Sequence, residues 1–187
     1  MNKFLTIIIA ILITHTVSAQ QNVTTFMGIP VQGSEKTMFS KLQAKGFKES
    51  DKGILMGEVE GKPSFLFIKT NNNNVSQIVV VEEDSVDNVN DAVEKFNLVL
   101  EAYRNDESHY TEYEYNFPIS EREEKTNKEY VKNGWYYAEF FQVCTPQNYS
   151  RRISLILSDE YGSYRIIKTY DNVYNMDESC PIWDIKQ

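Results

Sequence analysis

The chain has 187 residues and a formal net charge of −8, with 27 acidic side chains against 19 lysines and arginines. This length suits one domain with a substantial hydrophobic core. An acidic surface repels phosphate backbones and anionic lipids, and no lysine- or arginine-rich run reverses this locally. The composition therefore argues against nucleic acid as a partner and leaves a basic protein, a cation or a neutral ligand.

The N-terminus has the pattern of a secretory signal peptide. A short positive start precedes an almost entirely apolar run over residues 4–13, and Ala19 ends a small-x-small cleavage pattern. The apolar run is too short to cross a hydrocarbon core of about 30 Å. We therefore expect a signal peptide over 1–19 and a single exported domain over 20–187, periplasmic or secreted, with no membrane insertion after signal cleavage.

The exported part begins with a predicted helix between Ser34 and Gly46. Ser34 can cap its first turn, and Phe39 and Leu42 fall on one face. Gly46 supplies the left-handed residue that often ends a helix, and Phe47 stands where it would pack back onto Leu42 in a Schellman motif.

A second predicted helix is more strongly amphipathic. We expect it to start at Ser85 or Asp87. Its apolar stripe extends over about four turns and comprises Val89, Ala92, Val93, Phe96, Val99, Leu100 and Tyr103.

Elsewhere the apolar residues recur with the period of two that is typical of strands. The connections within each group of strands are too short for parallel crossovers, so the sheet should be largely antiparallel. The run Asn71 to Asn74 is interpreted as a hairpin loop because asparagine tolerates positive φ. The predicted strands are residues 53–61, 63–70, 75–83, 135–143, 151–158 and 163–170.

The order of elements predicts an α+β fold with two layers, in which helices pack on a largely antiparallel sheet. Two helix-plus-three-strand units are one way to build it. The corresponding halves would be residues 26–84 and 85–175, with a C-terminal tail over 176–187.

Residues 26–82 carry a resemblance to an N-terminal pattern of uncharacterised exported bacterial proteins. Its turns are marked by Gly28, Pro30, Gly33, Leu42, Gly46, Phe47, Gly57 and Gly61. The helix-plus-three-strand plan is also similar to the β-lactamase inhibitor protein and to outer-membrane-assembly lipoproteins of the SmpA/OmlA type, although this chain lacks their lipidated cysteine. The resemblance implies binding without catalysis, and it transfers no individual binding residue.

The two cysteines, Cys144 and Cys180, are predicted to form a disulfide, because an even count in an exported chain favours pairing. The alternative is a thiol nucleophile, for which His109 is the available base. These residues do not suit a tetrahedral zinc site. The oxygen-rich segment 171–179 has Val173 where a calcium loop needs a ligand. We therefore predict no metal and no cofactor.

Tyrosine is abundant, with 12 residues, and it offers a large contact area at small entropic cost. Residues 105–133 combine tyrosines with many acidic side chains. From this segment we predict a partner-binding face made of Tyr110, Glu112, Tyr113, Glu114 and Tyr115.

Two of these residues, Glu112 and Glu114, also suggest an alternative, because paired carboxylates on one strand face can act as acid and base. A separate signal is Asp84-Ser85-Val86, which is similar to a bacterial O-glycosylation sequon at Ser85.

The sequence contains no nucleophile elbow, phosphate loop or dinucleotide fingerprint. We therefore expect an exported, soluble, non-enzymatic binding protein that acts on another protein, with an inhibitor or immunity-type protein as one option. The alternative is a carboxylate-dependent hydrolase or a small-ligand-binding envelope protein.

Overall fold

The computed structural model of the chain describes residues 22–51, 53–106, 110–113, 124–142, 151–160 and 163–176. The predicted signal peptide, the tail beyond Met176, Cys144, Cys180 and His109 lie outside these ranges. Within them, no helix is long and apolar enough to span a bilayer.

The first half of the described chain contains one helix and six strands. In order these are β1 (Thr25–Phe26), β2 (Ile29–Pro30), α2 (Glu35–Ala44), β3 (Lys48–Glu49), β4 (Leu55–Val59), β5 (Lys62–Asn71) and β6 (Asn74–Glu82). The second half contains α3 (Val89–Arg104), β7 (Tyr110–Tyr113), α4 (Glu124–Lys132), β8 (Tyr137–Gln142), β9 (Arg152–Glu160) and β10 (Ser163–Asp171).

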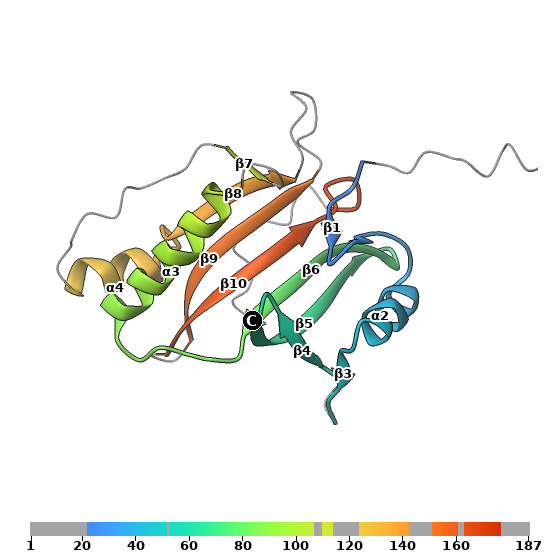
Figure 1. Ribbon diagram of the computed structural model, residues 1–187, viewed down its shortest axis with the longest axis horizontal. Helices are drawn as coiled ribbons and strands as arrows, with labels where there is room; N and C mark the ends of the chain where they lie inside the picture. Colours follow the sequence, from blue (N-terminus) through green and yellow to red (C-terminus); the bar gives the residue numbers. More distant parts are fainter. Residues whose placement is uncertain are drawn as a thin grey trace, which may run out of the picture.

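The strands form an eight-stranded sheet in the order β3-β4-β5-β6-β10-β9-β8-β7, beside a small β1-β2 hairpin. All strand pairs are antiparallel. The last strands of the two halves, β6 and β10, meet at the centre of the sheet (Figure 1). The predicted α+β fold with a largely antiparallel sheet is therefore confirmed.

The ends of the first helix form as predicted. The Ser34 hydroxyl accepts a hydrogen bond from the Thr37 amide at 3.3 Å. At the other end Gly46 has φ of 102°, and the Phe47 amide donates to the Leu42 carbonyl at 3.2 Å. This is the hydrogen bond of a Schellman motif.

The start of the second helix was predicted wrongly. Asn88, and not Ser85 or Asp87, is the N-cap, and its side chain accepts from the Asn90 and Asp91 amides at 2.8 and 3.3 Å. Ser85 lies exposed in the connection that precedes this cap. Asparagine, serine and aspartate cap helices almost equally well, so propensity alone does not select among them.

Two hairpin turns of the eight-stranded sheet place non-glycine residues in the left-handed region. Asn72 and Asn73 have φ of 49° and 61°, which confirms the hairpin loop predicted from the asparagine run. Glu60 and Gly61 join β4 to β5 with φ of 52° and 78°. Two successive residues at positive φ are characteristic of the tight turns that suit twisted antiparallel hairpins.

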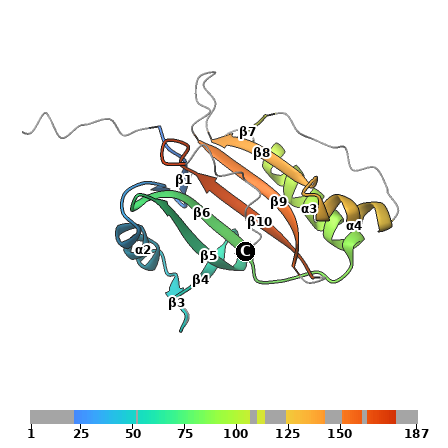
Figure 2. The same ribbon diagram turned by 180° about the vertical axis from the view of Figure 1, so that it is seen from behind.

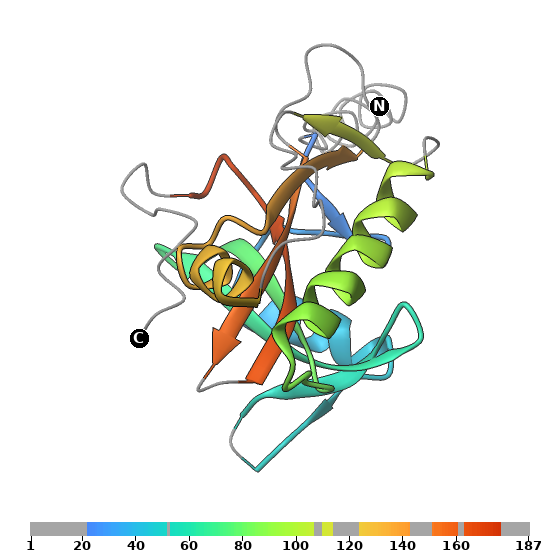
Figure 3. The same ribbon diagram turned by 90° about the vertical axis from the view of Figure 1, so that its left-hand side faces the viewer.

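One face of the sheet, called here the inner face, packs against α2 and α3. Its core includes Met38 and Leu42 from α2, Phe96 and Leu100 from α3, and Leu66 from β5. Figure 3 shows α3 (light green) lying beside β9 and β10 (orange). Helix α4 packs on α3 and on the end of β9.

The opposite face of the sheet is called here the outer face. It is turned towards the viewer in Figure 2. Val79, Ile156 and Ile167 form a second small apolar cluster on it. Ser154, which alternates with core residues of β9, is also fully buried. The alternation seen in the sequence therefore identifies the two faces correctly, but the outer face is less polar and less exposed than that pattern suggests.

Candidate functional site

Two charged residues stand at inward-facing positions of the central strands. Glu82 follows Val80 by two residues on β6, and Lys168 follows Ile166 by two on β10. Residues two apart on a strand share a face, and Val80 and Ile166 are core residues. Both charges are therefore buried, with side chains only 2% and 3% exposed.

Three lysines surround the Glu82 carboxylate. The Lys95 ammonium lies 2.8 Å from it, that of Lys62 at 3.2 Å and that of Lys168 at 3.8 Å. Burial by itself would raise the pKa of Glu82. The hydrogen bond from Lys95 and the positive charges of the three lysines outweigh burial and lower this pKa below its usual value. Glu82 is therefore held as a carboxylate and is unsuited to act as a general acid.

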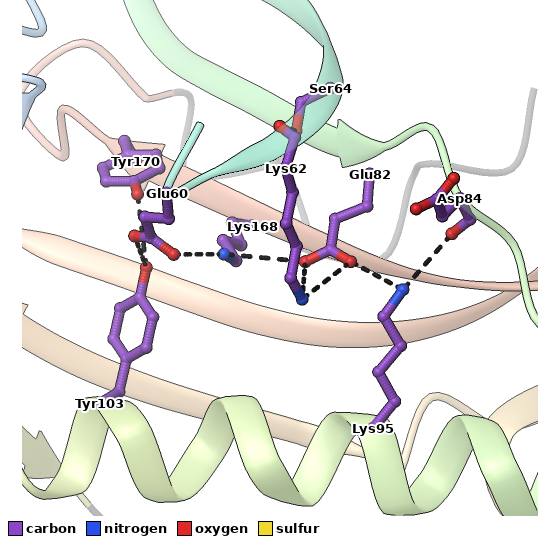
Figure 4. Close-up of polar contacts among 9 residues, drawn as sticks. All are labelled: Glu60, Lys62, Ser64, Glu82, Asp84, Lys95, Tyr103, Lys168 and Tyr170. Atoms are coloured by element: carbon purple, nitrogen blue, oxygen red, sulfur yellow. Dashed lines mark hydrogen bonds and ion pairs between the residues drawn. The ribbon is translucent and has the colours of Figure 1, made fainter. Parts of the chain in front are cut away.

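The buried Lys168 has a second carboxylate partner at the β4–β5 turn. Its ammonium lies 2.5 Å from Glu60 Oε2, while Glu60 Oε1 accepts a hydrogen bond from the Tyr103 hydroxyl at 2.9 Å. The same hydroxyl lies 3.4 Å from that of Tyr170, and the Lys168 ammonium is 5.8 Å from the centre of the Tyr103 ring. Figure 4 shows Glu60 directed towards both partners.

We call the five charged residues of this site the inner cluster: Glu60, Lys62, Glu82, Lys95 and Lys168. Two carboxylates and three ammonium groups give it a net charge of +1. The β4–β5 turn, β5 and β6 supply three members, whereas α3 and β10 supply two (Figure 4). The cluster thus links the two halves of the chain through ion pairs.

A different set of charges lies on the outer face. Asp171 is fully buried and accepts hydrogen bonds from Arg152 Nε and from Gln77 Nε2, both at 2.7 Å. Arg152 Nη1 also lies 3.5 Å from Glu139. We call Gln77, Glu139, Arg152 and Asp171 the outer cluster. Its members stand on four neighbouring strands, β6, β8, β9 and β10.

Tyr137 extends the outer cluster along β8. Its hydroxyl donates to Glu139 and lies 3.2 Å from the Ser154 hydroxyl. Burial and the hydrogen bond to the Glu139 carboxylate raise the pKa of Tyr137, so this phenol stays neutral. It therefore acts here as a hydrogen-bond donor.

Apolar side chains are exposed on the outer face of β4 and β5. Phe67 is 40% exposed and Met56 is 36% exposed. Met56 stands directly opposite Phe65 in the strand register, and Phe67 is the next residue on the same side of β5. Diagonal neighbours of this kind lie within reach of long side chains. We call Met56, Phe65 and Phe67 the outer patch.

The sequence prediction placed partner binding elsewhere, at the segment that contains β7. Tyr110 pairs with Gln142 and Tyr113 with Glu139, which makes β7 the edge strand beside β8. The side chains of residues 110–113 are not described, and Glu114 and Tyr115 lie outside the described residues. This part of the prediction is therefore neither confirmed nor contradicted.

Metal ligands do not converge in the described part of the chain, where no group of three or more His, Cys, Asp or Glu side chains could hold an ion. Asp171, the first residue of the oxygen-rich segment, is instead paired with Arg152. Comparison of the chain with known protein families, with curated proteins and with solved structures gives no match.

The sequence prediction missed the inner cluster, although a signal for part of it exists. Glu82 and Lys168 are in phase with apolar strand residues, so a search for charges at inward-facing positions would have found both. No local pattern reveals that the β4–β5 turn brings Glu60 to Lys168, because the two are far apart in sequence. The outer patch likewise depends on knowing which face of the sheet carries α2 and α3.

Proposed function

We propose that this chain is an exported, non-enzymatic protein-binding protein, periplasmic or secreted, that docks on its partner through the outer patch. The observation that carries the proposal is the exposure of Phe67 and Met56 on the sheet face opposite α2 and α3. Adjacent exposed apolar side chains on a soluble protein mark a surface of interaction more often than isolated ones do.

The charges beside the outer patch define the chemistry of the partner. Glu58 is exposed on the same side of β4 as Met56, and Lys69 is half-buried on the same side of β5 as Phe67. The partner surface should therefore be apolar, with a basic group facing Glu58 and an acidic group facing Lys69. The net charge of −8 further favours a basic partner, because opposite charges speed encounter.

The buried carboxylates support binding over hydrolysis. Glu82 is kept ionised by three lysines, and Asp171 is paired with Arg152. A pair of carboxylates that works as acid and base needs pKa values pushed apart, with one raised towards neutrality. The pKa of Glu82 is lowered instead.

The test compares capture of partner proteins from an extract of the native envelope by wild type and by variants. Replacing Met56 and Phe67 together with serine should lower capture of the partner at least tenfold. The matched control is Leu98→Ser, since Leu98 is 67% exposed on α3. Capture that falls equally for Leu98→Ser, or that persists in the double variant, would overturn the proposal.

A third variant separates the two candidate surfaces. Alanine at Tyr110 and Glu112 changes the edge strand β7, on which the sequence prediction placed the partner. If the outer patch is the docking surface, this variant should capture the partner as well as wild type does. If only this variant fails to capture the partner, the binding surface is β7 and not the outer patch.

A further inference from the structure

The β4–β5 hairpin carries the outer patch on one side and bends over the inner face at its end. The strand register aligns Lys168 on β10 with Val80 on β6, and Val80 with Leu66 on β5. Glu60 precedes Leu66 by about 20 Å along a straight strand. Its carboxylate nevertheless lies 2.5 Å from the Lys168 ammonium, so the hairpin end must curve over the sheet towards β10 (Figure 4).

Polar contacts add to the buried Val59 side chain in holding this bend. Glu60 binds Lys168 and the Tyr103 hydroxyl, and Lys62 binds Glu82 at 3.2 Å. Glu60 has φ of 52°, as its tight turn with Gly61 requires, so these contacts act on the direction of the turn and not on its type. The Glu60 contacts thus tie the turn to β10 and α3, and the Lys62 contact ties it to β6.

The two ends of the Glu60–Lys168 pair differ in exposure. The Glu60 side chain is 45% exposed, whereas that of Lys168 is 3% exposed. If Glu60 moves into water, its carboxylate is readily solvated. Lys168 does not become an isolated buried charge, because Glu82 remains 3.8 Å away. Release of Glu60 would therefore leave Lys168 with Glu82 as its counter-ion.

We propose that Glu60, Lys168 and Tyr103 form a latch that holds the β4–β5 hairpin bent and thereby positions the outer patch. Glu60 is a positioning residue, since it acts on Met56 and Phe65 through the hairpin that carries all three. The importance of the patch for binding rests on the proposed function. The latch itself does not, because it concerns contacts within the chain.

The test is hydrogen exchange of the exported chain with Glu60→Gln, at neutral pH. The amides of residues 55–66 should exchange at least tenfold faster than in wild type, while those of β9 keep their wild-type rates. The matched control is Glu101→Gln, which removes the same charge from a 57% exposed side chain paired with Arg104 on α3. It should leave the hairpin unchanged. Wild-type exchange in Glu60→Gln, or acceleration spread equally over the sheet, would overturn the latch.

A second readout follows the outer patch directly and needs no partner. The methyl resonance of Met56 should shift in Glu60→Gln, and that of Met27 in the β1–β2 turn should stay in place. Tyr103→Phe removes only the hydroxyl that binds Glu60, so its Met56 shift should lie between those of wild type and Glu60→Gln. An unchanged Met56 resonance in both variants would contradict the link between latch and patch. Because these readouts use the isolated protein, they can fail or succeed independently of the proposed function.

Discussion

The inner and outer clusters show two ways in which one sheet accommodates buried charge. The outer cluster connects β6, β10, β9 and β8, which are already neighbours in the sheet. Its central carboxylate, Asp171, has a single cationic partner among the described residues, Arg152. The inner cluster connects a hairpin turn, a helix and a distant strand, and its central carboxylate, Glu82, has three cationic partners.

This difference predicts different responses to the loss of one residue. Asp171 has no second cation among the described residues, so loss of Arg152 should leave a buried charge unpaired and destabilise the whole sheet. Glu60 is half exposed and Lys168 keeps Glu82 as a second partner, so loss of Glu60 should act locally. We infer that the outer cluster serves stability and that the inner cluster serves the position of the β4–β5 hairpin.

The largest effect should come from Arg152→Met. It leaves the fully buried Asp171 with Gln77 and without a cation, and breaking a buried ion pair in this way costs about 3–5 kcal/mol. Urea unfolding of the purified chain measures the loss. Glu101→Gln, which disrupts an exposed pair, should cost at most about 0.5 kcal/mol. If Arg152→Met lowers the free energy of unfolding by less than about 1 kcal/mol, the outer cluster does not serve stability as proposed.

The next effect concerns the predicted Cys144–Cys180 disulfide, whose cysteines lie outside the described residues. Cys144 follows the end of β8 closely, and Cys180 follows Met176, whose sulfur accepts a hydrogen bond from Arg152 at 3.4 Å. A disulfide stabilises a fold mainly by restraining the unfolded chain. Reduction should lower the free energy of unfolding by about 2–4 kcal/mol. Two free thiols in the exported protein, detected by labelling and intact mass, would contradict the prediction.

A smaller effect should come from Gly57→Ala, on the inner face of β4. A Cβ atom at this position would stand 2.4 Å from the Phe47 ring, well inside van der Waals contact. Overpacking of this kind costs about 1–3 kcal/mol. Adding Phe47→Leu should restore part of the lost stability, because the smaller side chain makes room. Equal stability of the single and double variants in urea unfolding would show that Phe47 is not the cause.

The smallest effect is the pH dependence that Glu82 contributes. Its pKa is lowered in the folded state from the ordinary value of 4.5. Its ionic stabilisation is therefore complete above about pH 4.5 and is lost as the pH falls through the folded pKa, by at most about 1.4 kcal/mol per pH unit. The difference in unfolding free energy between wild type and Glu82→Gln should shrink in this range. A difference that stays constant from pH 7 to pH 3 would show that Glu82 is not held ionised by its lysines.

Local chemistry explains which parts of the fold the sequence predicts well. Ser34, Gly46 and the asparagine run act on their own backbone, so the first helix and the β5–β6 turn follow from the residues themselves. Helix α4 was missed because its segment is charge-rich, and of its side chains only Asn127 and Val131 are buried. Its position depends on packing against α3, and on contacts such as the one from Asn127 Nδ2 to Asn90 Oδ1 at 2.8 Å.

The candidate site was less predictable because it depends on contacts over long sequence separations. Glu60 meets Lys168 only after β4, β5, β6 and β10 have paired in register and the hairpin has bent. The exposure of Phe67 follows from α2 and α3 covering the other face. Strand periodicity shows that two faces exist, but tertiary packing decides which of them is left open.

The most direct test of the account is photo-crosslinking from the outer patch in native cells. A photoreactive phenylalanine analogue at position 67 should crosslink the chain to a partner protein. The same analogue at position 98, on the exposed side of α3, should give no such product. Crosslinks of equal yield from both positions, or from position 98 alone, would contradict the claim that the outer face of β4 and β5 binds the partner.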